Sequence, residues 1–125
     1  MRDPEKKSVS VLVVEDEHLI RMDTVSSLEA QGFIVHEAGN AAEAISCLDI
    51  HNEIRLIFTD VHMPGSMDGV ALAHYVRNRW PPVKIIVTSG YAKVSEGDLP
   101  AGALFIEKPY YPVNIAHKMS DLLGA

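Results

Sequence analysis

Five short apolar runs, rich in Val and Ile, recur along the chain. They occupy residues 8–14, 33–37, 55–59, 83–88 and 103–107. Continuous runs of this kind are typical of strands buried on both faces, as in a parallel sheet. The pattern therefore predicts five strands, each covered by other elements on both sides.

Between these runs the apolar period changes to that of a helix. After the first strand we expect an apolar helix face with a stop at Gly32; the face comprises Leu19, Met22, Val25 and Leu28. Asn40, with Glu43 three residues later, predicts the N-cap of a second helix. A third helix ends at Pro81-Pro82 and a fifth covers residues 115–123. The stretch 91–99 is weakly helical at best, so the fourth helix should be short or irregular.

Five strands that alternate with five helical segments require right-handed crossovers. We therefore expect an α/β fold, a doubly wound five-stranded parallel sheet in which the βα unit is repeated five times. One domain would cover residues 8–125, and residues 1–7 would form a flexible N-terminal tail.

Composition and charge exclude several classes of protein. The 125 residues carry a formal net charge of −6, which argues against direct nucleic-acid binding. Neither an apolar run long enough for membrane insertion nor a signal peptide is found, so we expect a cytoplasmic protein. Cys47 is the only cysteine, and the six histidines include no pair at helical ligand spacing. The sequence thus does not predict a histidine-built metal site.

Polar side chains follow four of the predicted strands: Glu15 and Asp16 the first, Asp60 the third, Ser89 the fourth and Lys108 the fifth. Ligands of open α/β sheets bind beyond the carboxyl ends of the strands, so these groups should meet there. Three carboxylates and one ammonium give a formal charge of −2, which suits a hard divalent ion such as Mg²⁺. A carboxylate can also be the nucleophile in phosphoryl transfer.

Five short motifs follow one another along the chain: residues 13–17 (VVEDE), 59–65 (TDVHMPG), 67–69 (MDG), 87–90 (VTSG) and 107–109 (EKP). In these motifs, and from about Ser8 to Leu123, the chain resembles the receiver domains of two-component response regulators. The resemblance implies a single-domain, CheY-like receiver of flavodoxin-like fold. It also implies that Asp60 accepts a phosphoryl group from a sensor histidine kinase or a histidine phosphotransfer protein.

The resemblance also implies the metal ligands. Asp16 and Asp60 would hold Mg²⁺, Glu15 would act through a water molecule, and the main-chain carbonyl of His62 would complete the shell. His62 and Tyr91 match positions that tune the lifetime of the phosphate.

Three further residues take their expected roles from the family. Ser89 would bond the phosphoryl group and act in the switch, Lys108 would pair with the phosphate, and Phe105 matches the aromatic switch position. Other interpretations remain open. Ser89 could cap the next turn, Thr88 beside it leaves a one-residue ambiguity, and Phe105 could be ordinary core.

Two departures from the family pattern concern the loops. Ser66 is an extra residue after Pro64-Gly65, and the segment between Ser89 and Lys108 is shorter than usual. The short segment puts in doubt the output surface that the family forms from its fourth helix, fifth strand and fifth helix. Because the sequence stops at Ala125, we expect the output to come through contacts with a downstream protein target, unless the chain is an excised piece of a longer protein. A homodimer is a further option.

The residues support a signalling switch rather than an enzyme with turnover, beyond self-phosphorylation and slow self-dephosphorylation. One alternative is a degenerate receiver that binds a partner without phosphorylation. Another is a phosphatase of the haloacid dehalogenase type. Such enzymes need a second acid two residues after the nucleophile, where this chain has His62.

Overall fold

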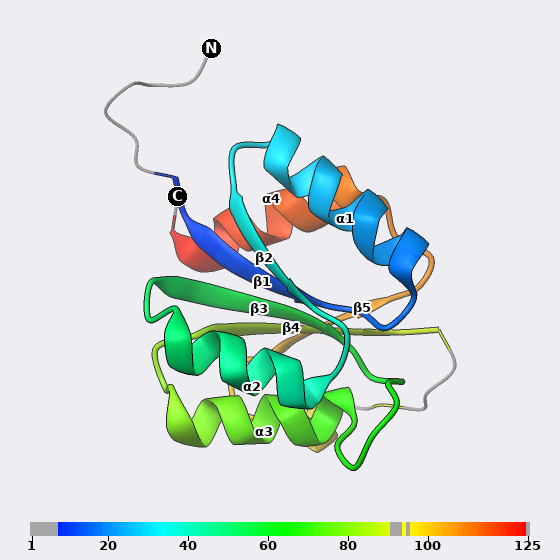
Figure 1. The fold of residues 1–125 in the computed structure, drawn as a ribbon, viewed down its shortest axis with the longest axis vertical. Helices are drawn as coiled ribbons and strands as arrows, with labels where there is room; N and C mark the ends of the chain where they lie inside the picture. Colours follow the sequence, from blue (N-terminus) through cyan, green and yellow to red (C-terminus); the bar gives the residue numbers. More distant parts are fainter. Residues whose placement is uncertain (1–7, 91–93, 95, 125) are drawn as a thin grey trace.

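The computed structural model describes residues 8–90, 94 and 96–124, which form three layers (Figure 1). In the middle lies a five-stranded sheet in the order β2-β1-β3-β4-β5, and every neighbouring pair is parallel. The strands are β1 (Ser10–Val14), β2 (Ile34–Ala38), β3 (Ile54–Asp60), β4 (Lys84–Ser89) and β5 (Leu104–Glu107). The predicted α/β fold with a doubly wound parallel sheet is confirmed.

Helices cover both faces of the sheet. As Figure 1 shows, α1 (His18–Ala30) and α4 (Pro112–Leu123) lie on one face, and α2 (Ala41–Ile50) and α3 (Gly69–Arg79) on the other. Successive strand residues therefore belong to different cores: Ile57 packs on the α2–α3 side and Phe58 on the α1–α4 side. No helix in the described part of the chain is both long and apolar enough to cross a membrane.

Two helices begin at the caps that their sequences provide. The side chain of Asn40 accepts a hydrogen bond from the Glu43 N–H at 2.9 Å, and the Asp68 side chain accepts one from Ala71 at 2.9 Å. Each satisfies a backbone donor that has no partner within its helix. The Asp68 cap fixes the start of α3, directly after the loop that follows β3.

Between β4 and β5 the described residues form only a 3₁₀ turn, η1 (Glu96–Asp98). The expected short or irregular fourth helix is therefore confirmed, and the label α4 belongs to the last helix of the chain. Tyr91 and the predicted tail of residues 1–7 lie outside the described residues.

The predicted inner face of α1 is wrong in its first half. Val25 and Leu28 are buried, but Leu19 is 78% exposed and Met22 51% exposed. The reason is geometric: a three-residue step advances a helix by about 300°, so each step drifts by about 60°. Leu19, nine residues before Leu28, consequently lies on the opposite side of the helix.

Candidate functional site

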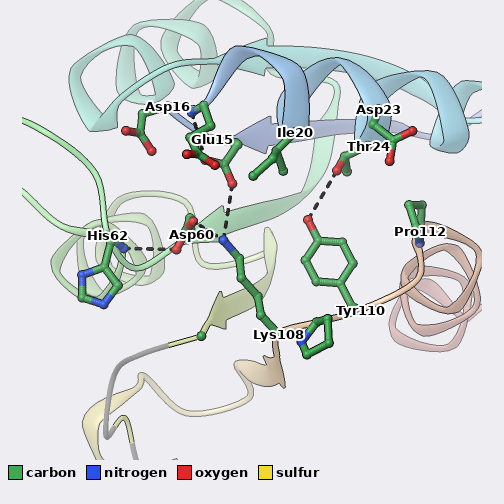
Figure 2. A pocket seen from close by; sticks show the side chains of 13 residues that line it. Glu15, Asp16, Ile20, Asp23, Thr24, Asp60, His62, Lys108, Tyr110 and Pro112 are labelled. Carbon is green, nitrogen blue, oxygen red and sulfur yellow. Dashed lines mark hydrogen bonds and ion pairs between the residues drawn. The ribbon is translucent and has the colours of Figure 1, made fainter.

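An open pocket of about 670 Å³ lies at the carboxyl edge of the sheet. Five of the residues predicted to carry chemistry line it: Glu15, Asp16, Asp60, His62 and Lys108 (Figure 2). They come from the ends of β1, β3 and β5, which shows that the parallel topology brings the strand ends together as expected.

Asp60 is the last residue of β3 and is only 6% exposed. The Lys108 ammonium donates to its Oδ2 atom at 2.6 Å, and the His62 main-chain N–H donates to its Oδ1 atom at 3.2 Å. Both carboxylate oxygens are thus held in place (Figure 2). The bond from Lys108 is charge-assisted and, at this length, fixes the orientation of the Asp60 carboxylate.

Glu15 lies beside this pair and is 5% exposed. Its Oε1 atom is 3.7 Å from Lys108 Nζ, and its Oε2 atom accepts a hydrogen bond from the Glu17 N–H at 3.0 Å. Burial, reinforced by the negative charge of Asp60, raises the pKa of Glu15 from 4.5 to about 7. Lys108 lowers the pKa of Glu15, but by less than burial and Asp60 raise it.

Lys108 is placed by the end of the sheet. Its main-chain N–H donates to the carbonyl of Ser89 at 3.1 Å, which continues the pairing of β4 with β5 past the last strand residue. Burial lowers the pKa of the Lys108 ammonium, but the hydrogen bond and charge attraction of Asp60, followed by Glu15, outweigh it and raise the pKa. Lys108 therefore stays charged at neutral pH.

The acidic residues fit a hard metal ion. Glu15, Asp16 and Asp60 each offer a carboxylate oxygen, and these atoms all lie within 4.8 Å of one another. Two of the carboxylates are buried, whereas Asp16 is exposed and open to solvent. An all-oxygen donor set with an open side suits Mg²⁺, which keeps several of its waters. A divalent cation bound here would offset both the burial of Glu15 and the negative charge of Asp60, the two effects that raise the pKa of Glu15.

Ser89 and Phe105 do not line the pocket. Ser89 is 2% exposed at the end of β4, and Phe105 packs against the core on the α2–α3 side. Thr88, in register with Asp60 on the neighbouring strand, has a buried Oγ1 atom with no hydrogen bond to any described residue. The predicted roles of Ser89 and Phe105 stay predictions, and the one-residue ambiguity with Thr88 stays open.

Thr24 and Tyr110 are among the pocket-lining residues that sequence reasoning missed. Their hydroxyl groups face each other in Figure 2, with 3.3 Å between the two oxygens. The Tyr110 ring also packs edge-on against the Phe58 ring, with 5.4 Å between the ring centroids. Burial raises the pKa of Tyr110, so its hydroxyl remains protonated at neutral pH. The two residues are 86 positions apart. The proximity of Tyr110 to the Lys108-Pro109 motif is the one local signal that could have marked it.

Known proteins match the chain over most of its length. The response regulator receiver domain family matches residues 11–120. The response regulator receiver protein CpdR of Brucella abortus is 30% identical over 118 residues, which cover 92% of this chain and 97% of that protein. The sensor kinase CckA of the same organism is 37% identical over 120 residues, 93% of this chain but 13% of the kinase.

Other relatives are longer than the match. The chain corresponds to 53% of the transcriptional regulatory protein PdtaR of Mycobacterium tuberculosis, at 34% identity over 118 residues. A crystal structure of a response regulator receiver protein from Sinorhizobium medicae superposes with a TM-score of 0.87 at 28% identity, over 95% of this chain and 97% of that one. The fold and the acidic pocket, which also contains Lys108, agree with these matches. The chain therefore belongs to the receiver domain family of two-component response regulators.

Proposed function

We propose that Asp60 is phosphorylated and that the resulting aspartyl-phosphate switches the contacts of this receiver with a partner protein. The observation that carries the proposal is the environment of the Asp60 carboxylate. It is buried at a strand end, it faces an open pocket, and it lies 2.6 Å from an ammonium that can neutralise added charge. A carboxylate held only for stability would not need access to a pocket.

In the proposed step, one Asp60 carboxylate oxygen attacks the phosphorus of a phosphohistidine. The new P–O bond forms as the P–N bond breaks, and the electron pair of that bond returns to the imidazole nitrogen of the donor. The Lys108 ammonium then has phosphoryl oxygens within its reach and balances their charge. The His62 N–H keeps the carboxylate oriented during the attack.

The three carboxylates support a bound Mg²⁺, with Glu15, Asp16 and Asp60 as the side chains that would hold it. When bound, the ion would supply positive charge next to the transferred phosphoryl group. Asp16 is exposed and contributes its charge at the mouth of the pocket. We expect Asp16→Asn to weaken Mg²⁺ binding, as measured by metal titration; an unchanged affinity would contradict this ligand assignment.

Exposed apolar side chains in the first turn of α1 support a binding surface there for the protein that delivers the phosphoryl group. Ile20 lines the pocket and is 37% exposed, and Leu19 beside it is 78% exposed. A histidine donor must bring its imidazole to Asp60, so its own surface must cover the rim of the pocket. Exposed apolar side chains at that rim would bury their area against the donor, a sensor histidine kinase or a histidine phosphotransfer protein.

Intact-mass measurement after incubation with acetyl phosphate and Mg²⁺ tests the proposal. We expect the mass of one phosphoryl group in the native chain and in Asp23→Asn, whose carboxylate also lines the pocket, but not in Asp60→Asn. A mass gain that persists in Asp60→Asn, or no gain in the native chain, would contradict the proposal. Sustained turnover of phosphomonoesters would instead indicate a phosphatase.

A further inference from the structure

A second cluster of ligand-type side chains lies on the α2 side of the sheet, away from the acidic pocket. His36 of β2, Cys47 of α2 and His51 directly after α2 each offer one donor atom, and these atoms all lie within 4.8 Å of one another. The two imidazole rings are 4.2 Å apart between centroids. The sequence did not predict a histidine-built site, yet the fold assembles two histidines and the single cysteine.

Local structure explains the assembly. Cys47 and His51 are four residues apart, so they lie on one face of the helix, and the His51 N–H donates to the Cys47 carbonyl at 2.8 Å. His36 pairs with Leu12 of β1, whose side chain belongs to the core on the α2–α3 side. His36 therefore points toward α2, and the crossover from β2 to β3 brings the three side chains together.

The cluster lacks hydrogen bonds that its burial would require. The Nε2 atom of His36 is buried and has no hydrogen-bond partner within the described part of the chain. The charged side chain of Glu53 lies beside the cluster, with its Oε2 atom 3.7 Å from that nitrogen and 3.5 Å from Nδ1 of His51. A buried polar atom left without a partner costs free energy, which a ligand bound to it would recover.

We propose that His36, Cys47 and His51 form a second metal site, specific for a borderline transition-metal dication such as Zn²⁺. Two imidazoles and a thiolate are the donors that Zn²⁺ prefers, and a tetrahedral Zn²⁺ separates its nitrogen and oxygen ligands by about 3.4 Å. The Glu53 oxygen is already close to that distance from both rings. Glu53 can therefore be the fourth ligand of the ion. Alternatively, it can orient the two imidazole rings while a water molecule is the fourth ligand.

The thiol and the access route are compatible with this assignment. Burial, and then the charge of Glu53, raises the pKa of the Cys47 thiol in the metal-free chain. A bound dication would reverse this effect by stabilising the thiolate, and the proton would pass to solvent. The His51 side chain is 38% exposed, so an ion can reach the cluster from solvent.

The two metal sites should be independent. His51 and Glu53 lie next to the start of β3 (Ile54), whereas Asp60 ends the same strand at the opposite edge of the sheet. Their donors also differ in kind: the acidic pocket offers only carboxylate oxygens, and the second cluster offers nitrogen and sulfur. Saturation of the pocket with Mg²⁺ should therefore leave the second cluster free to bind Zn²⁺.

Calorimetric titration of the tag-free chain with Zn²⁺, in saturating Mg²⁺, tests the proposal. We expect one Zn²⁺ per chain, an affinity lowered by more than about 100-fold in Cys47→Ser and in His51→Gln, and no change in His117→Gln, an exposed histidine on α4. Co²⁺ should give a thiolate charge-transfer absorption band in the native chain that Cys47→Ser abolishes.

Three results would overturn the second metal site. One is the absence of Zn²⁺ binding by the native chain. Another is an affinity that survives both Cys47→Ser and His51→Gln. The third is loss of Zn²⁺ binding in Asp16→Asn, which would place the ion in the acidic pocket. Because His51 is partly exposed at the end of a helix, His51→Gln should leave the fold intact, and circular dichroism can check this directly.

Discussion

Glu15→Gln should make the metal-free protein more stable at high pH. In the folded chain the Glu15 carboxyl is 5% exposed and has a pKa of about 7, against an ordinary value of 4.5. The folded state therefore keeps a proton that the unfolded state releases between these two values. Stability must fall as pH rises through this window, because the unfolded state then binds fewer protons than the folded state.

The magnitude follows from the two pKa values of Glu15. Ionisation of this carboxyl should destabilise the fold by about 1 kcal/mol at pH 5 and about 3 kcal/mol at pH 8. Glutamine has no charge to bury, and its amide oxygen can still accept the hydrogen bond from the Glu17 N–H. The gain in unfolding free energy on Glu15→Gln should thus grow by about 2 kcal/mol between pH 5 and pH 8.

Urea unfolding at both pH values, in the presence of a chelator, measures this gain. Glu29→Gln, which changes an exposed glutamate near the end of α1, is the matched control and should show no comparable pH dependence. Added Mg²⁺ should stabilise the native chain at pH 8 more than it stabilises Glu15→Gln. An equal gain at both pH values, or an equal gain in the control, would refute the raised pKa assigned to the buried Glu15 carboxyl.

Three further substitutions test other parts of the site. Gly69→Ala should lower stability by about 1–3 kcal/mol and slow phosphorylation, because the added Cβ would overlap the main-chain carbonyl of Asp60; urea unfolding and intact-mass kinetics measure both. Tyr110→Phe should cost about 1 kcal/mol of unfolding free energy through loss of the bond to Thr24, whereas Tyr111→Phe, at a 74% exposed position, should cost nothing measurable. Leu19→Ser should slow phosphotransfer from a phosphohistidine donor by about fivefold or more, yet leave phosphorylation by acetyl phosphate unchanged. Ile50→Ser, at a similarly exposed position on α2, is its control, and equal rates in the two variants would argue against docking at α1.

The sequence predicted the fold well because strand burial and helix period are local signals. Every predicted strand is present within two residues at either end, and the cap at Asn40 forms the expected hydrogen bond. The irregular segment before β5 was also predictable from its glycines and proline. The inner face of α1 was not predictable in the same way. Apolar residues spaced by three drift around a helix, so their pattern does not show which of them contact the sheet.

The site was predictable where the topology alone brings groups together. Parallel strands deliver Glu15, Asp16, Asp60 and Lys108 to one edge, so their meeting followed from the strand order. The pairing of Thr24 with Tyr110 and the approach of His36 to Cys47 depend on which side chains cross between a helix and a neighbouring element. That information lies in tertiary packing, and periodicity does not carry it.

The most direct test of the central claim is to locate the phosphoryl group on the chain. Borohydride reduces an aspartyl-phosphate to homoserine, which peptide mapping by mass spectrometry assigns to one residue. After reaction with a phosphorylated histidine kinase and Mg²⁺, we expect homoserine at position 60 and aspartate unchanged at positions 16, 23 and 68. Homoserine at any of those other positions, or at none, would contradict the assignment of Asp60 as the phosphoacceptor.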